Sequence, residues 1–169
     1  MNYFELYNIP VSFQPDLILI KKKFYELSRQ YHPDFFTNSS EEEQVEVLEK
    51  SSLVNKAFKT FSNPDETIKY VLQLKGLLEE EEKYQLPPDF LMEVMEINEQ
   101  LMDAKIDAAT EKIQGYTTQV STLQNEIYEP VKQIVEHYQE GNISEKELLQ
   151  VKEYYYKKKY LNRILAGLN

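Results

Sequence analysis

The 169-residue sequence contains no cysteine and no tryptophan, only two histidines and only four glycines. Without cysteine, this chain has no disulfide, no thiolate nucleophile and no thiolate ligand for zinc or an iron–sulfur cluster. The two histidines, His32 and His137, are too few to build a histidine metal centre. The scarcity of glycine argues against an all-β chain, which needs frequent turns. We therefore expect no metal site and no bound cofactor.

Long apolar runs and glycine-rich phosphate loops are also missing. No uninterrupted apolar stretch approaches the roughly 18 residues of a membrane span, and no P-loop pattern occurs. A helical pattern begins at Tyr3, with no signal or transit leader before it. We expect a cytoplasmic protein that does not enter a membrane and does not bind ATP by a known motif.

The net charge is −10, and the charge is unevenly distributed. Residues 1–75 carry nine basic and eleven acidic side chains, whereas residues 76–169 carry ten and eighteen, so the second part holds −8 of the total. An acidic chain repels phosphate backbones, which argues against nucleic-acid binding. The acidic surface also favours a monomer.

Apolar residues recur at three- and four-residue steps along nearly the whole chain, so we expect an all-α protein. Two segments, Ser40–Glu43 and Ser144–Glu147, have the form of capping boxes and mark helix starts. In the first part of the chain, the expected helices cover residues 3–8, a stretch from Pro15 to just before Pro33, and stretches that begin at Ser40 and at Asn63. In the second part they cover residues 89–113, 117–139 and 145–166. The helix over 117–139 is expected to bend at Pro130.

The acidic run Glu79–Glu82, followed by Pro87-Pro88, indicates a linker between two domains. We expect this run to be solvated and prone to form helix. The predicted organisation is an N-terminal domain over residues 1–75, an acidic linker over 76–88 and a C-terminal helical domain over 89–169.

The tripeptide His32-Pro33-Asp34 follows an amphipathic helix. The buried stripe of that helix is predicted to contain Leu17, Ile20, Phe24, Leu27 and Tyr31, and a second, mostly basic flank contains Lys21, Lys22, Tyr25 and Arg29. Taken alone, these features fit a solvated helix that a proline ends. A hydrolase site with His32 and Asp34 is a weaker interpretation, because no serine or threonine stands in a recognisable nucleophile setting.

The tripeptide also precedes a helix carrying the pattern "VNKAFKTF", in which Val54, Ala57, Phe58 and Phe61 face one side together with Val47 or Leu48. This combination resembles the J domain of DnaJ-type co-chaperones over residues 1 to about 75. The resemblance implies an antiparallel helical hairpin with flanking helices. It also implies that His32, Pro33 and Asp34, with the basic flank, bind a DnaK-type chaperone and stimulate its ATPase. Phe35 departs from the pattern, since many J domains carry a basic residue there.

The first helix of the C-terminal domain has more apolar surface than a bundle needs. Phe90, Val94, Ile97, Leu101, Ala104 and Ala108 form a core stripe, and a second stripe contains Leu91, Met95, Met102 and Ile106. Carboxylates border the second stripe. A methionine-rich surface of this kind is typical of a protein-binding face. The alternative is a wide core contact, or packing against the N-terminal domain.

The domain order and the segment "FLMEVMEINEQL" resemble the HscB family of co-chaperones, in its bacterial form. The Cys-rich segment that precedes the J domain in some eukaryotic members is absent from this chain. The resemblance implies a C-terminal three-helix bundle that binds an iron–sulfur scaffold protein of the IscU type and delivers it to a chaperone of the HscA type, without catalysis by the co-chaperone itself. The implied client-binding residues are Leu91, Met92, Met95, Glu96, Glu99, Asp103 and Tyr155.

Three other interpretations stay open. A J-domain co-chaperone could serve a different client. A purely structural helical assembly protein would tolerate changes at His32 and Asp34, and the hydrolase would act on a small substrate without any partner. For Tyr155, ordinary core packing is the alternative to client contact.

Overall fold

The computed structural model describes residues 1–167, and every regular element in that range is a helix. This confirms the all-α class. The chain forms two compact units, of which the first comprises residues 1–75 together with residues 138–142. The second comprises residues 76–137 and the chain from residue 143 onward.

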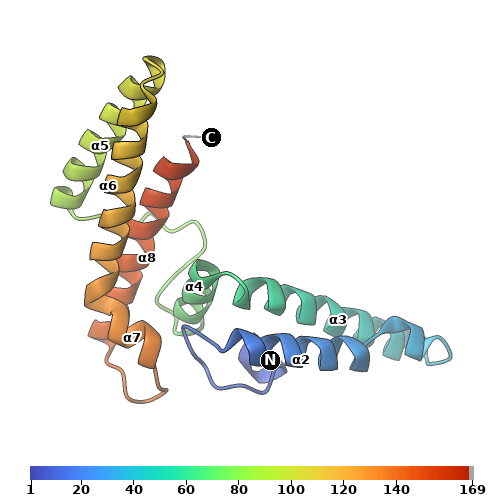
Figure 1. Cartoon of the computed structure of the whole chain (residues 1–169). Coiled ribbons are helices and arrows are strands. Elements are labelled where there is room, and N and C mark those ends of the chain that lie inside the picture. Colours follow the sequence, from blue (N-terminus) through green and yellow to red (C-terminus); the bar gives the residue numbers. More distant parts are fainter. Residues whose placement is uncertain (168–169) are drawn as a thin grey trace. The chain divides into compact units, whose positions relative to one another are not determined.

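The first unit is built around a pair of helices. Helices α2 (Leu17–Gln30) and α3 (Glu41–Phe61) lie side by side as an antiparallel hairpin (Figure 1), as the J-domain resemblance implies. A 3-10 helix, η1 (Pro33–Phe36), lies in the connection between them and packs against α3. The flanking helices α1 (Tyr3–Leu6) and α4 (Pro64–Leu74) both pack against α3.

The core of the first unit agrees with the predicted α3 face. Val54, Ala57 and Phe61 are buried. Of the two candidates about two turns before Val54, Val47 is buried whereas Leu48 is exposed. Tyr7 is also buried, and its hydroxyl donates a hydrogen bond to the carbonyl oxygen of Val54 at 2.8 Å.

The predicted stripe of α2 is only partly buried. Ile20 is buried, and the half-buried Phe24 stacks on Phe58 with ring centroids 4.2 Å apart. Leu17 was expected in this stripe, but it is exposed. The reason is the helix start. Asp16 caps the helix by accepting a hydrogen bond from the backbone N–H of Ile18, so Leu17 is the first helical residue and lies at the very end of the predicted stripe.

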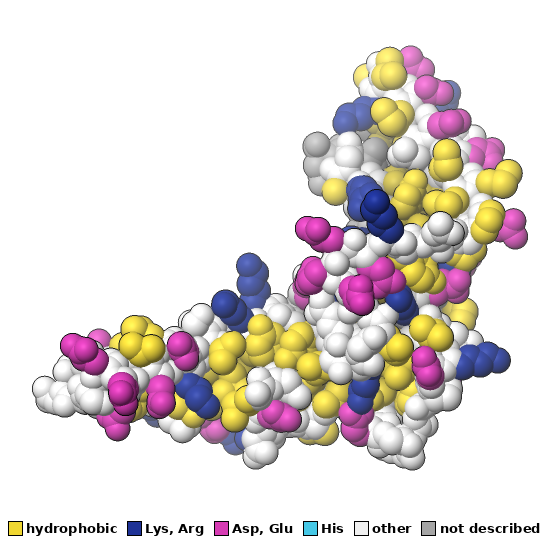
Figure 2. All heavy atoms as spheres, turned by 180° about the vertical axis from the view of Figure 1, so that it is seen from behind, with side chains coloured by type: hydrophobic (Ala, Val, Ile, Leu, Met, Phe, Trp, Pro, Cys, Tyr) yellow, Lys and Arg dark blue, Asp and Glu magenta, His cyan; other side chains and the backbone are white. Residues whose placement is uncertain are grey.

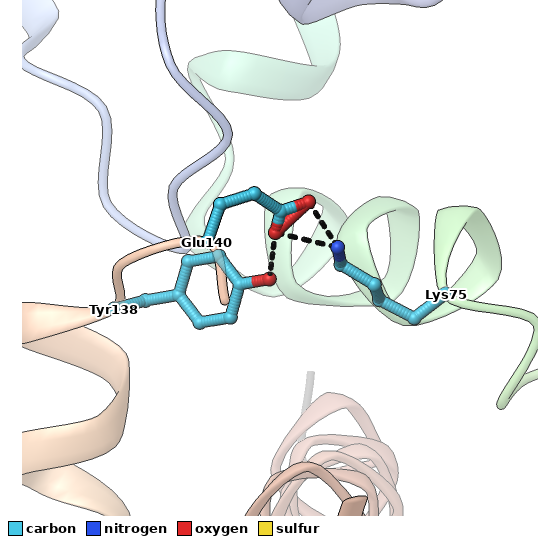
Figure 3. Close-up of polar contacts among 3 residues, drawn as sticks. All are labelled: Lys75, Tyr138 and Glu140. Atoms are coloured by element: carbon cyan, nitrogen blue, oxygen red, sulfur yellow. Dashed lines mark hydrogen bonds and ion pairs between the residues drawn. The ribbon is translucent and has the colours of Figure 1, made fainter. Parts of the chain in front are cut away.

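A polar cluster at the end of α4 includes residues from the segment 138–142 (Figure 3). Lys75 pairs with the carboxylate of Glu140, and the hydroxyl of Tyr138 donates to the same carboxylate at 2.5 Å. The ring of Phe13 meets the ring of Tyr138 edge-on, with centroids 5.1 Å apart. These contacts make Tyr138 a buried member of the first unit, although it was expected in the last turns of a C-terminal helix.

The second unit is a three-helix bundle, as predicted. It contains α5 (Pro88–Ile106), α6 (Thr110–Tyr128) with the short η2 (Glu129–Val131) and α7 (Lys132–His137) after it, and α8 (Glu145–Ala166). Its core includes Phe90, Val94, Ile97, Leu101, Val120, Leu123, Leu161 and Ile164.

Two helix boundaries in this unit differ from the prediction. Helix α5 ends seven residues before the predicted residue 113, because Ala108 adopts a left-handed backbone (φ 51°) and the N–H of Ala109 bonds back to the carbonyl of Ala104. Ala108 is therefore exposed in a turn and not part of the core stripe. The predicted helix 117–139 begins at Thr110 and is interrupted at η2, where Pro130 lacks the N–H that an α-helix requires.

The acidic connector was expected to be solvated and prone to form helix, and only the first part of this expectation holds for most of the run. Residues 77–87 form no helix, and Leu78 is buried. Glu82 forms an ion pair with Lys152 of α8 at 2.6 Å, while Glu79, Glu80 and Glu81 are exposed. The connector is fixed on the second unit because tertiary contacts with α8 supply partners for its side chains.

Candidate partner-binding surfaces

The His32-Pro33-Asp34 turn lies at the end of the helical hairpin. Tyr31 ends α2, and His32 takes an extended conformation that caps η1, in which Pro33 is the first residue. Proline fits that position because its φ is already helical and its missing N–H is not needed there. The backbone N–H of Asp34 donates to the Nδ1 atom of His32 at 3.2 Å. The local sequence therefore holds the turn in one shape.

Both polar side chains of the turn are open to solvent. The side chain of His32 is 52% exposed and that of Asp34 is 85% exposed, and Asp34 Oδ2 lies 3.7 Å from His32 Nδ1. Since Nδ1 accepts a hydrogen bond, a neutral imidazole carries its proton on Nε2, which becomes the donor that a partner would meet. The ring of the exposed Phe35 lies edge-on to His32, with centroids 5.9 Å apart.

The predicted basic flank is a continuous exposed face of α2. Lys21, Lys22, Tyr25 and Arg29 are all exposed, and they lie one to three turns before the His32 turn. The sequence analysis missed Ile18, which belongs to the same face because it lies four residues before Lys22. Ile18 is more exposed than Tyr25, the aromatic residue that was predicted on this face. The face thus combines cations with apolar side chains.

The predicted client face on α5 is also open. Met92 is 71% exposed and Met95 is 52% exposed, with Leu91 half-buried beside them. The bordering carboxylates, Glu96, Glu99 and Asp103, are exposed as well. The face continues along the helix through Met102 and Ile106. Exposure is what a binding face requires, and the role of these residues stays a prediction.

Tyr155 differs from the other predicted client-binding residues. Tyr155 is only 7% exposed, and its ring lies edge-on to that of Tyr156, with the ring centroids 5.1 Å apart. This burial fits the alternative of ordinary core packing. A client could contact this side chain only after it was uncovered. Tyr156 is the more accessible of the two, and it stacks on Tyr84 at 4.5 Å. Burial, together with the nearby carboxylate of Glu82, raises the pKa of Tyr156 to about 12.

Other kinds of site are not apparent in residues 1–167. In that range no group of three or more side chains is arranged to hold a metal ion. None of the helices described is long and apolar enough to cross a membrane.

Two family models match the chain. The DnaJ domain matches residues 2–70, which contain the hairpin and its turn. The HSCB C-terminal oligomerisation domain matches residues 86–169, which contain the bundle. A co-chaperone protein HscB homolog from Vibrio cholerae is 32% identical over 126 residues, which cover 73% of this chain and 74% of that protein.

The chain belongs to the HscB family of J-domain co-chaperones. A relative from mouse, named iron-sulfur cluster co-chaperone protein HscB, is 39% identical over 115 residues. This match covers 68% of the present chain and 49% of the mouse protein, about half its length.

Two solved HscB structures have the same fold. The HscB chaperone from Vibrio cholerae superposes with a TM-score of 0.74 at 26% identity, covering 99% of this chain and 95% of that one. The crystal structure of human co-chaperone protein HscB superposes with a TM-score of 0.78 at 31% identity. This match covers 99% of the present chain and 80% of the human chain. The C-terminal family model is described as an oligomerisation domain. The monomeric state that we expected from the acidic surface therefore stays a prediction.

Proposed function

We propose that this HscB-family chain is a cytoplasmic co-chaperone that brings an iron–sulfur scaffold protein of the IscU type to a DnaK-type chaperone of the HscA type. The α5 face binds the scaffold, and the His32 turn with the basic flank of α2 stimulates the ATPase of the chaperone. The main support is the turn itself. Its backbone is held by Pro33 and by the hydrogen bond from Asp34 to His32, while both polar side chains remain exposed.

Charge and rigidity explain how the first unit would act. The cations of α2 attract an acidic surface on the chaperone and increase the rate of encounter. The turn then presents the His32 imidazole and the Asp34 carboxylate in a fixed geometry, so little conformational entropy is lost on binding. Stimulation of ATP hydrolysis requires that these contacts be stronger in the hydrolysing state of the chaperone than in its resting state.

The second unit supplies the client. Because one chain carries both binding faces, a bound scaffold has a high effective concentration near the chaperone. Client delivery and ATP hydrolysis would then be coupled without any chemical step on the co-chaperone. This agrees with the naming of the relatives as co-chaperones.

The decisive experiment replaces His32 with glutamine. We expect H32Q to bind purified scaffold with unchanged affinity but to lose the stimulation of chaperone ATPase, because the imidazole acts only at the turn. H137Q is a matched control, since His137 is also exposed but lies at the end of α7 in the other unit. Full stimulation by H32Q would disprove the proposed role of the turn.

A J-domain co-chaperone with a different client is the second candidate. One observation favours it, namely that Tyr155, the predicted aromatic contact to the scaffold, is buried. The two candidates differ in a direct binding measurement. Stimulation of the chaperone by the unmodified protein, without detectable binding of purified scaffold, would support the second candidate.

A further inference from the structure

A pocket of about 340 Å³ lies between α5 and α8 in the second unit, beside the client face. Its apolar wall contains Leu101, Met102 and Ile164, and its polar groups include the Tyr160 ring and the cationic side chains of Lys105 and Arg163. None of the described residues that line it is acidic. The pocket therefore combines an apolar wall with two positive charges, in a chain whose net charge is −10.

The two cations are suited to hold a carboxylate. The Nζ atom of Lys105 donates to the backbone carbonyl oxygen of Gly167 at 2.9 Å, which places the ammonium at the end of α8 and leaves two of its three donors for a ligand. Arg163 presents a planar guanidinium that can bind a carboxylate through two parallel hydrogen bonds. Neither side chain forms an ion pair with a carboxylate of residues 1–167.

The pocket continues the client face across α5. Met95 and Met102 are seven residues apart and lie on nearly the same line of the helix, since each residue advances about 100°. Glu99 and Asp103 border this line on one side. Lys105 lies on the opposite side, toward α8. Apolar side chains gather on the visible face of the bundle in Figure 2, with acidic and basic side chains around them. By the spacing along α5, the client face is apolar along its centre and has opposite charges on its two edges.

We infer that this pocket binds an acidic side chain of the client protein, a glutamate or aspartate that follows an apolar segment seated on Met95 and Met102. The inference rests on the proposed function, because it takes the α5 face as the client face. The apolar wall accommodates the methylene groups of the client side chain, and the two cations accommodate its carboxylate. A client segment with its acidic residue on the other side would meet Glu99 and Asp103, so the charge pattern fixes the orientation of the bound client.

The test uses the full chain with both cations neutralised, K105Q/R163Q, and measures affinity for purified iron–sulfur scaffold by calorimetry. We expect affinity to fall by about 10- to 30-fold, because charge-assisted hydrogen bonds to carboxylates are lost. The matched control is K112Q/K146Q, which removes the same charge from two exposed lysines that do not line the pocket. We expect this control to change the affinity by less than about 3-fold.

Equal losses of affinity in the two double variants would overturn the inference, because the effect would then come from long-range charge alone. No loss of affinity in either double variant would overturn it as well. R163Q alone keeps the bond from Lys105 to Gly167, so a loss of affinity in this variant separates ligand binding from damage to the end of α8. The charge-reversed variant K105E should bind the unmodified scaffold weakly. It should regain affinity for a scaffold variant in which the acidic residue is changed to lysine. If unmodified protein does not bind scaffold at all, the proposed function fails; if it binds and K105Q/R163Q binds equally well, only the pocket inference fails.

Discussion

Replacement of Met92 and Met95 by alanine tests the client face most directly, because the free protein barely uses these side chains. Both are more than half exposed, so M92A/M95A should leave the free energy of unfolding within about 0.5 kcal/mol of its original value. Any loss of scaffold binding would then reflect lost contacts and not unfolding.

The expected loss follows from the exposed fractions. Full burial of a methionine side chain stabilises by about 2 kcal/mol. If the scaffold covers the 71% and 52% that are now exposed, the two side chains contribute roughly 1.4 and 1.0 kcal/mol. Alanine retains the Cβ atom, so the double variant should lose about 2 kcal/mol of binding free energy, or about 30-fold in Kd.

Isothermal titration calorimetry with purified scaffold measures this loss. L149A serves as the control, since Leu149 is an exposed apolar residue on α8 outside the predicted face. A change in Kd of less than about 3-fold for M92A/M95A, or an equal change for L149A, would refute the assignment of the face. Stimulation of the chaperone in the absence of scaffold should be unaffected, because the His32 turn lies in the other unit.

Two further predictions concern stability of the first unit. Tyr7→Phe removes the buried hydrogen bond to the Val54 carbonyl and should cost about 1 kcal/mol in urea unfolding, whereas the same change at the exposed Tyr25 should cost nothing measurable; equal costs would contradict the argument. The hydrogen bonds from Lys75 and then Tyr138 lower the pKa of Glu140, so its contribution is present above the unfolded-state pKa of about 4.3 and is lost as the pH falls. E140Q should therefore be less stable than the original protein by under about 1 kcal/mol at pH 7, and the two stability curves should converge in acid; parallel curves would argue against the pair.

Local features were predictable because they depend on residues only a few positions apart. The helix start at Ser144 is a complete capping box, Asn63 caps α4 with Pro64 at its first position, and Pro130 interrupts the helix that precedes it. The end of α5 was missed because Ala104 and Ala108 continue the apolar spacing. The left-handed turn at Ala108 reverses the chain toward α6, and alanine gives no sign of such a turn in a sequence.

The amino-acid sequence by itself determined the helices, the His32-Pro33-Asp34 turn, the basic face of α2 and the apolar stripe of α5, since each arises from spacing along one helix or from proline geometry. Only the tertiary structure decided which apolar side chains are covered. Tyr155 is buried while Met92 is exposed, although both are large residues on amphipathic helices. The tertiary structure also brings Lys105 and Arg163 to one pocket. Burial and pairing depend on partners from distant segments, and periodicity within one helix carries no information about them.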